Sequence, residues 1–158
     1  MINIAAVVDS LGPSQKSFYL IKEFNRASLK QDVCVSVFHK RASISVIPTM
    51  FSCKNISSLS GFHHTAISTT IVDASILLSS SNACSKYLYL WDFDWLGSTM
   101  KFKDVCKVLL DERLNIIARS DEHAQMIENY CNKKPVAIID NWKLEDLISL
   151  TQEGYANV

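Results

Sequence analysis

The chain has 158 residues, 48% of them hydrophobic, which predicts one folded domain with its own core and excludes a disordered polypeptide. Sixteen basic and sixteen acidic side chains cancel, so the net charge gives no argument for a protein that binds nucleic acid or a membrane surface. No apolar run approaches the roughly 20 residues that cross a bilayer, and the first residues lack the basic leader of a signal peptide.

The five cysteines are widely spaced along the chain and include no CxxC pair. This pattern is typical of buried free thiols in a reducing compartment, and it argues against a disulfide scaffold or a zinc site. We therefore expect no metal site of this kind and a cytoplasmic location. The composition fits equally a protein that a virus or phage makes in the cytoplasm of its host.

The first forty residues predict a strand, a helix and a second strand. Residues 2–8 (INIAAVV) are apolar and β-branched, which indicates a buried strand. Turn-forming residues follow, and from residue 15 to about residue 30 the apolar side chains recur at helical spacing. Residues 33–38 (VCVSVF) predict the second strand. A strand–helix–strand unit of this length is the building block of parallel sheets.

Residues 39–60 predict an irregular segment with one short strand. After them the alternation of strands and helices continues. We expect further strands at 66–70, 86–91, 114–118 and 135–139, and helices at 72–81, 102–110, 120–131 and 144–150. The predicted fold class is α/β, with a single doubly wound, mostly parallel sheet of about six strands and helices on both faces, a Rossmann-like domain. It spans residues 1–151, and residues 152–158 are expected to form a frayed tail.

The stretch KYLYLWDFDWL, residues 86–96, combines a strand with a group of functional side chains. Its apolar run suits a strand covered on both faces, and ligands of open α/β sheets bind beyond the carboxyl ends of strands. Asp92 and Asp94 could together chelate a divalent cation that holds a diphosphate. Alternatively, one carboxylate caps the backbone of residues 97–98 or the next helix, and both tryptophans pack in the core. We expect Trp91 in the core, and Trp95, past the strand end, as a stacking surface.

The loop after the first strand, DSLGPSQKS, precedes a helix, where backbone N–H groups can hold a phosphate. Gly12 and Ser14 are therefore candidate ligand-binding residues. Gly12, Lys16 and Ser17 resemble part of a phosphate-binding loop, but a single glycine matches neither known glycine pattern. The alternative is a helix start capped by Ser14, with Lys16 exposed.

Two further pairs of residues are candidates. His63 or His64 could act as a general base or contact a phosphate, although neighbouring histidines point apart and one is expected on the surface. Arg119 and Ser120 stand between a strand end and a helix start, where they could hold an anion. The alternative for this second pair is a helix cap and an ion pair to a neighbouring carboxylate.

The order of these segments resembles the amino-terminal domain of two-domain glycosyltransferases of the GT-B architecture, including phage-encoded versions. The resemblance is carried by the stretches LGPSQKSFYLIKEFNRA, YLYLWDFDWL, IIARSDEHAQMIENY and PVAIIDNW. It implies a glycosyltransferase-like domain equivalent to the acceptor-side half, with a nucleotide sugar as the possible co-substrate. The second Rossmann-like domain of that family has no counterpart here, so sugar transfer would need a partner chain or a homo-oligomer.

Three hypotheses follow. In a catalytic protein, Asp92 or Asp94, an imidazole of His63 or His64, and Arg119 would face one cleft, and a structure that separates them would argue against catalysis. In the second hypothesis the fold is retained for binding alone, with exposed Trp95 and Trp142 and residues 39–60 as an interaction surface. A metal-dependent single-domain transferase, resting only on the Asp-x-Asp triplet, is the third.

Overall fold

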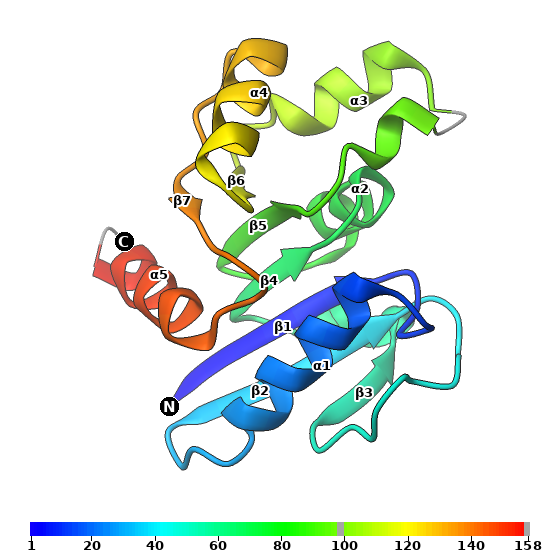
Figure 1. Ribbon diagram of the computed structural model, residues 1–158, viewed down its shortest axis with the longest axis vertical. Coiled ribbons are helices and arrows are strands. Elements are labelled where there is room, and N and C mark those ends of the chain that lie inside the picture. Colours follow the sequence, from blue (N-terminus) through cyan, green and yellow to red (C-terminus); the bar gives the residue numbers. More distant parts are fainter. Residues whose placement is uncertain (98–99, 157–158) are drawn as a thin grey trace.

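The computed structural model describes the backbone of residues 1–97 and 100–156, and the side chains of these residues apart from 95, 97 and 153–156. Its centre is one parallel sheet of seven strands in the order β3-β2-β1-β4-β5-β6-β7 (Figure 1). The strands are β1 (Ile2–Val8), β2 (Val33–His39), β3 (Ser52–Asn55), β4 (Thr65–Ser68), β5 (Ser85–Leu90), β6 (Leu114–Ala118) and β7 (Ala137–Ile138). The predicted α/β class and Rossmann-like arrangement are confirmed.

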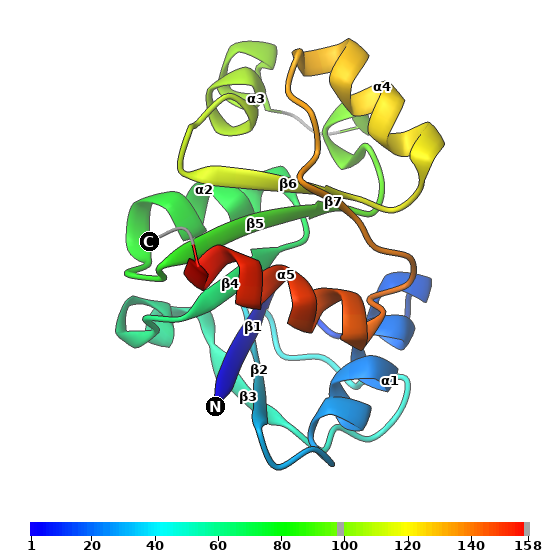
Figure 2. The same cartoon turned by 90° about the vertical axis from the view of Figure 1, so that its left-hand side faces the viewer.

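Helices connect the strands and cover both faces of the sheet. They are α1 (Gln15–Ala27), α2 (Ile71–Ser80), α3 (Phe102–Leu109), α4 (Asp121–Cys131) and α5 (Leu144–Ala156), with two 3₁₀ turns, η1 (Ile56–Gly61) and η2 (Asp94–Gly97). Helices α1 and α5 pack together on one face, and α2, α3 and α4 pack on the other. Figure 2 shows α5 crossing in front of the central strands. Within the described residues, no helix is long and apolar enough to cross a membrane.

Strand β5 shows why an almost unbroken apolar run is required at the centre of such a sheet. Tyr87, Tyr89 and Trp91 belong to the core under α1 and α5. Leu88 and Leu90 alternate with them and belong to the core under α2 and α3. Successive side chains of a strand point to opposite faces, so a strand covered on both sides needs apolar residues at every position. The predicted two-sided burial of this strand, and of Trp91, is confirmed.

The irregular stretch contains its one short strand at β3, and this strand is the seventh of the sheet. All four residues of β3 are exposed, because it lies at the edge of the sheet and pairs only with β2. No alternation of apolar and polar residues marks such a strand. At the other edge β7 has two residues, fewer than the predicted 135–139.

Two expectations about burial are wrong. Trp142, predicted to be exposed, is completely buried, and its ring lies 4.8 Å from that of Tyr89 and 6.0 Å from that of Phe24. The chain reverses here with φ of 61° at Trp142, which turns the indole under α5 rather than into water. The cysteines are free, as predicted, but three are exposed and two are partly exposed, so they are not core residues.

Candidate functional site

The strand order changes direction between β1 and β4, and a cavity lies at this point. From β1 the chain continues into α1 on one face, whereas from β4 it continues into α2 on the opposite face. The two loops separate and leave a cavity of about 150 Å³ at the carboxyl edge of the sheet, the usual ligand position in open α/β folds. We call it the switch-point cavity; its lining residues are Val8, Asp9, Ser10, Lys16, Ser17, Leu20, Thr69 and Thr70.

The first turn of α1 and the N-cap residue of α2 line this cavity. Ser14 caps α1, and its Oγ accepts the backbone N–H of Ser17 at 3.0 Å, as one of the sequence alternatives predicts. Thr70 caps α2 in the same way, accepting the backbone N–H of Asp73 at 3.0 Å. Helix N-termini carry partial positive charge, and Lys16 adds a full charge from the first turn of α1. The cavity is therefore electrostatically suited to an anionic group.

A buried ion pair supports the α2 side of the site. The Asp73 side chain is completely buried, and its Oδ1 lies 2.6 Å from Nζ of Lys40, which follows β2. The contact is an ion pair without the alignment of a hydrogen bond, and neither carboxylate oxygen has a hydrogen-bond partner. The backbone N–H of Lys40 also donates to the carbonyls of Val8 and Asp9, so the end of β2 is fastened to the loop after β1.

Asp94 lies beside the N-terminus of α2, whereas Asp92 is exposed. Burial raises the pKa of Asp94 above its ordinary value, and the nearby Lys16 and the backbone N–H of Ile71 oppose this shift. Asp94 therefore interacts with the first turn of α2, a helix that precedes it in the chain, and not with the following helix that one sequence alternative named. The two carboxylates of the Asp-x-Asp triplet thus differ in their surroundings, Asp92 being exposed and Asp94 partly buried. The Trp95 side chain lies outside the described residues.

Arg119 and Ser120 lie farther along the same edge, after β6. The guanidinium of Arg119 lies 4.9 Å from the centre of the Trp91 ring, a cation–π contact. Ser120 caps α4, its Oγ accepting the backbone N–H of His123 at 3.2 Å. Among the described ion pairs, Arg119 makes none with the two carboxylates that follow, so the aromatic ring is its partner. The guanidinium thus lies over the Trp91 ring and is partly exposed.

His63 and His64 lie at the amino-terminal ends of the strands, on the opposite side of the sheet from the switch-point cavity. They immediately precede β4, and Nε2 of His64 is 3.5 Å from the side-chain nitrogen of Asn3, at the start of β1. Both histidines are exposed. The structure therefore does not bring either imidazole to Asp92, Asp94 or Arg119, all of which follow the carboxyl ends of strands. The one-cleft arrangement expected of a catalytic protein is not formed.

Gly12 lies at the carboxyl edge with ordinary backbone geometry. Its N–H donates to Ser10 Oγ at 3.4 Å, and no described glycine has positive φ. A Cβ at this position would meet Ser10 Oγ at 3.4 Å and Ser43 at 3.7 Å, which are ordinary contacts. The backbone here is not shaped for close approach of a phosphate, so Gly12 borders the site without the special role that glycine has in phosphate-binding loops.

Sequence reasoning missed Lys40, Thr69, Thr70 and Asp73. The segment Thr70–Asp73 has a hydroxyl followed three residues later by a carboxylate, a pattern that marks helix starts. This pattern, together with the strand-end rule applied to β4, could have identified three of these residues. Among the residues that the structure describes, no three histidine, cysteine or acidic side chains group closely enough to hold a metal ion.

No protein-family model, curated protein or solved structure matches the chain. The site is therefore interpreted from its geometry, and the resemblance to GT-B glycosyltransferases stays a prediction.

Proposed function

We propose that this protein is a ligand-binding Rossmann-like module that holds the phosphoryl group of a small molecule in the switch-point cavity. The observation that carries the proposal is the meeting of two capped helix N-termini and Lys16 at one cavity. The positive dipole end of each helix favours a negative group there, and Lys16 adds a full positive charge, while the lining carboxylate of Asp9 is paired with Arg41. The hydroxyls of Ser17 and Thr70 can donate hydrogen bonds to phosphate oxygens, whereas the hydroxyl of Thr69 donates to the carbonyl of Val7.

The size of the cavity limits what it can hold. A volume of about 150 Å³ is below the 300–1,000 Å³ typical of pockets that enclose a drug-sized ligand. It corresponds to about five water molecules at roughly 30 Å³ each. A phosphoryl group with the first atoms attached to it fits this space, and the rest of the ligand extends outside.

Binding without catalysis is the better supported form of this proposal. The two imidazoles that could act as general bases lie at the far edge of the sheet. The partly buried carboxylate of Asp94 interacts with the start of α2 through the N–H of Ile71, and that of Asp73 is paired with Lys40. The groups around the cavity are thus a cation, hydroxyls, helix ends and the Asp9 carboxylate, whose charge is paired with Arg41.

A second candidate is the acceptor-side half of a glycosyltransferase-like assembly, completed by a partner chain or a second copy. It is favoured by the common position of six residues singled out from the sequence: Gly12, Ser14, Asp92, Asp94, Arg119 and Ser120 all follow carboxyl ends of strands. A second domain docked over that edge would enclose them. A nucleotide sugar is the co-substrate that the family resemblance implies for this case.

Calorimetric titration and thermal unfolding with inorganic phosphate and with UDP-glucose, each with and without Mn²⁺, test the proposal. A ligand at about one hundred times its Kd stabilises the native state by about 2.7 kcal/mol. For a protein of this size the melting temperature should rise by about 5–10 °C. If neither compound raises it at millimolar concentration, the proposed function is wrong.

Lys16→Met and Lys22→Met form a matched pair of variants. Both lysines belong to α1, but Lys16 lines the cavity and Lys22 is exposed elsewhere on the helix. Because Lys16 contributes a charge-assisted contact, its replacement should weaken phosphate binding by about tenfold or more. Lys22→Met should bind as the wild type does; equal losses in both variants would show a nonspecific charge effect.

The second candidate has its own measurement. Sedimentation analysis gives the oligomeric state, and release of UDP from UDP-glucose measures turnover. A monomer that binds phosphate but releases no UDP supports simple binding. A dimer that turns over the nucleotide sugar supports the glycosyltransferase-like assembly instead.

A further inference from the structure

Strand β3 forms one edge of the sheet and is open on its outer side. It is the last strand in the sheet order and pairs only with β2 (Figure 1). All four of its residues are exposed. The outward N–H and C=O groups of such an edge strand are free to pair with a strand from another chain. The edge of β3 is therefore a surface at which the sheet can be extended.

The loop between β2 and β3, residues 40–51, is fastened to α1 and so fixes the position of this edge. The side-chain amide of Asn25 donates to the carbonyl of Pro48 at 2.8 Å and accepts the N–H of Met50 at 2.7 Å. The ring of Phe51 also packs on a phenylalanine ring of α1, 5.6 Å away. Because the strand is held in place before a partner arrives, the entropic cost of adding a strand is lowered.

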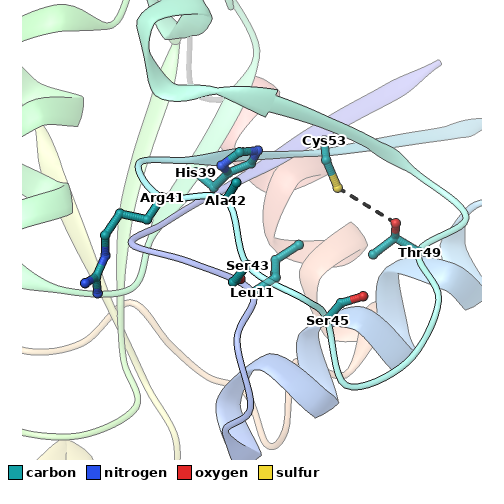
Figure 3. Close-up of a pocket in the computed structure, with 8 residues that line it drawn as sticks. All are labelled: Leu11, His39, Arg41, Ala42, Ser43, Ser45, Thr49 and Cys53. Carbon is teal, nitrogen blue, oxygen red and sulfur yellow. Dashed lines mark hydrogen bonds between the residues drawn. The ribbon is translucent and has the colours of Figure 1, made fainter.

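On the α1 side of the sheet, apolar and concave surface borders the edge. The loop exposes Ile44 (90%) and Met50 (60%), the second of them two residues before β3. A cavity of about 210 Å³ lies between the loop and β3, and Figure 3 shows Cys53 pointing from β3 toward Thr49 of the loop. Cys53 is exposed and also lines this cavity, so the cavity lies next to the strand edge.

The surroundings of β3 carry positive charge and no acidic side chain. Residues 33–72 contain no aspartate or glutamate, and they include the loop before β3 and its neighbours β2 and η1. Lys40 and Arg41 are already paired with carboxylates outside this range. Lys54 of β3 is exposed and takes part in none of the described ion pairs. Charge complementarity therefore favours an acidic segment at this edge.

The two faces of β3 differ, which determines the pattern of side chains that fits beside it. Cys53 pairs with Val37, a residue of the core under α1. Lys54 pairs with Phe38, which belongs to the core on the opposite face, and its Nζ lies 6.0 Å from the centre of that ring. Side chains of paired residues on neighbouring strands point to the same face. An added strand should therefore place apolar side chains on the Cys53 face and acidic ones on the Lys54 face.

A second copy of the same edge does not fit this pattern. Two β3 strands side by side would bring together two copies of Lys54 with no acidic side chain between them, and like charges on paired strands are destabilising. A lysine on an edge strand is a common protection against self-association. The charge thus selects a strand from a different protein.

We propose that β3 binds an extended segment of a partner protein, in which acidic and apolar side chains alternate, as an eighth strand of the sheet. Backbone hydrogen bonds supply the affinity, and the two unlike faces supply the specificity. This function goes beyond phosphoryl binding and does not depend on it, because no residue of β3 lines the switch-point cavity.

Fluorescence anisotropy with three labelled eight-residue peptides tests the proposal on the full chain. The first alternates valine and glutamate, the second alternates valine and lysine, and the third has four valines followed by four glutamates. The first should bind with a Kd below about 100 µM and about tenfold more tightly than the other two. Equal affinity for the first and third peptides would show simple charge attraction and overturn the proposal, as would absence of binding.

Two charge-reversal variants locate the binding site. Lys54→Glu should weaken binding of the valine–glutamate peptide by about fivefold at low salt and strengthen binding of the valine–lysine peptide. Lys103→Glu, at an exposed position of α3, is the matched control and should leave both affinities unchanged. If Lys54→Glu has no effect, or no more than Lys103→Glu, the peptide does not pair with β3 and the inference is wrong.

Hydrogen exchange and sedimentation of the wild type give evidence that needs no variant. The valine–glutamate peptide should slow the exchange of backbone amides in β3 by about tenfold and leave those of β7, the other edge strand, unchanged. Protection of β7 instead of β3 would overturn the proposal. So would a dimer of the unliganded chain that the peptide dissociates, because a second copy would then be the natural occupant of the edge.

Discussion

Replacing Lys40 by methionine is expected to destabilise the protein strongly, because it leaves the Asp73 carboxylate buried without a counter-charge. Asp73 is completely buried and Lys40 is its ion-pair partner, with 2.6 Å between Nζ and Oδ1. Methionine keeps most of the length and apolar volume of the lysine stem. It also preserves the backbone N–H that Lys40 donates to Val8 and Asp9. The variant therefore isolates the charge.

The magnitude follows from the burial of the two partners. Removing one member of a buried ion pair costs about 3–5 kcal/mol, mainly because the other charge stays desolvated. The Lys40 side chain is 22% exposed, so water reaches this end of the pair and the lower value, about 3 kcal/mol, is expected. The melting temperature should then fall by about 6–12 °C. Asp73→Asn should cost only about 1 kcal/mol, because the lysine that it leaves can turn toward water.

Urea unfolding of the wild type, both single variants and the double variant measures these differences. The double variant should be about as stable as Asp73→Asn alone, which gives a coupling free energy of about 2 kcal/mol or more. If Lys40→Met costs less than about 1 kcal/mol, or no more than Asp73→Asn, the carboxylate is not held as a buried charge and the reasoning fails.

Three further predictions concern the core and the response to pH. Trp142→Ala should cost about 3–5 kcal/mol in urea unfolding, because the indole is completely buried, whereas Trp142→Phe should cost much less, since the indole Nε1 has no partner to lose. Equal costs would contradict this account. Because the pKa of Asp94 is raised in the folded protein, the native state still binds a proton at pH values just above 3.8, where the unfolded chain has lost it. The stability of the wild type relative to Asp94→Asn should therefore decrease as the pH rises above 3.8. An unchanged difference between pH 3 and pH 7 would contradict the assigned direction. Arg113 lowers the pKa of Asp111 to about 2, so this pair stabilises the protein above the ordinary value of 3.8 and the stabilisation is lost as pH falls toward about 2. Arg113→Ala should therefore flatten the acid side of the stability curve, and an unchanged curve would show that the exposed pair contributes nothing.

The candidate site was partly predictable from local sequence. A side chain that follows a strand lies at the carboxyl edge of a parallel sheet, and this rule correctly groups Ser14, Asp94 and Arg119. The same rule places His63 and His64 at the other edge, because they precede a strand. Their assignment to a catalytic cleft depended on residue type alone, and residue type carries no information about position.

The fold class, the order of strands and helices and the two-sided burial of β5 were determined by the sequence itself, because periodicity and helix capping are local properties of the chain. The spatial order of the strands was decided only in the tertiary structure, since it places β4 beside β1 and so creates the switch-point cavity. Lys40 and Asp73 meet for the same reason, although they come from different elements. Trp142 is buried only because α5 returns to the face that α1 covers. Each of these contacts joins residues far apart in the chain, and a local pattern cannot specify such a pairing.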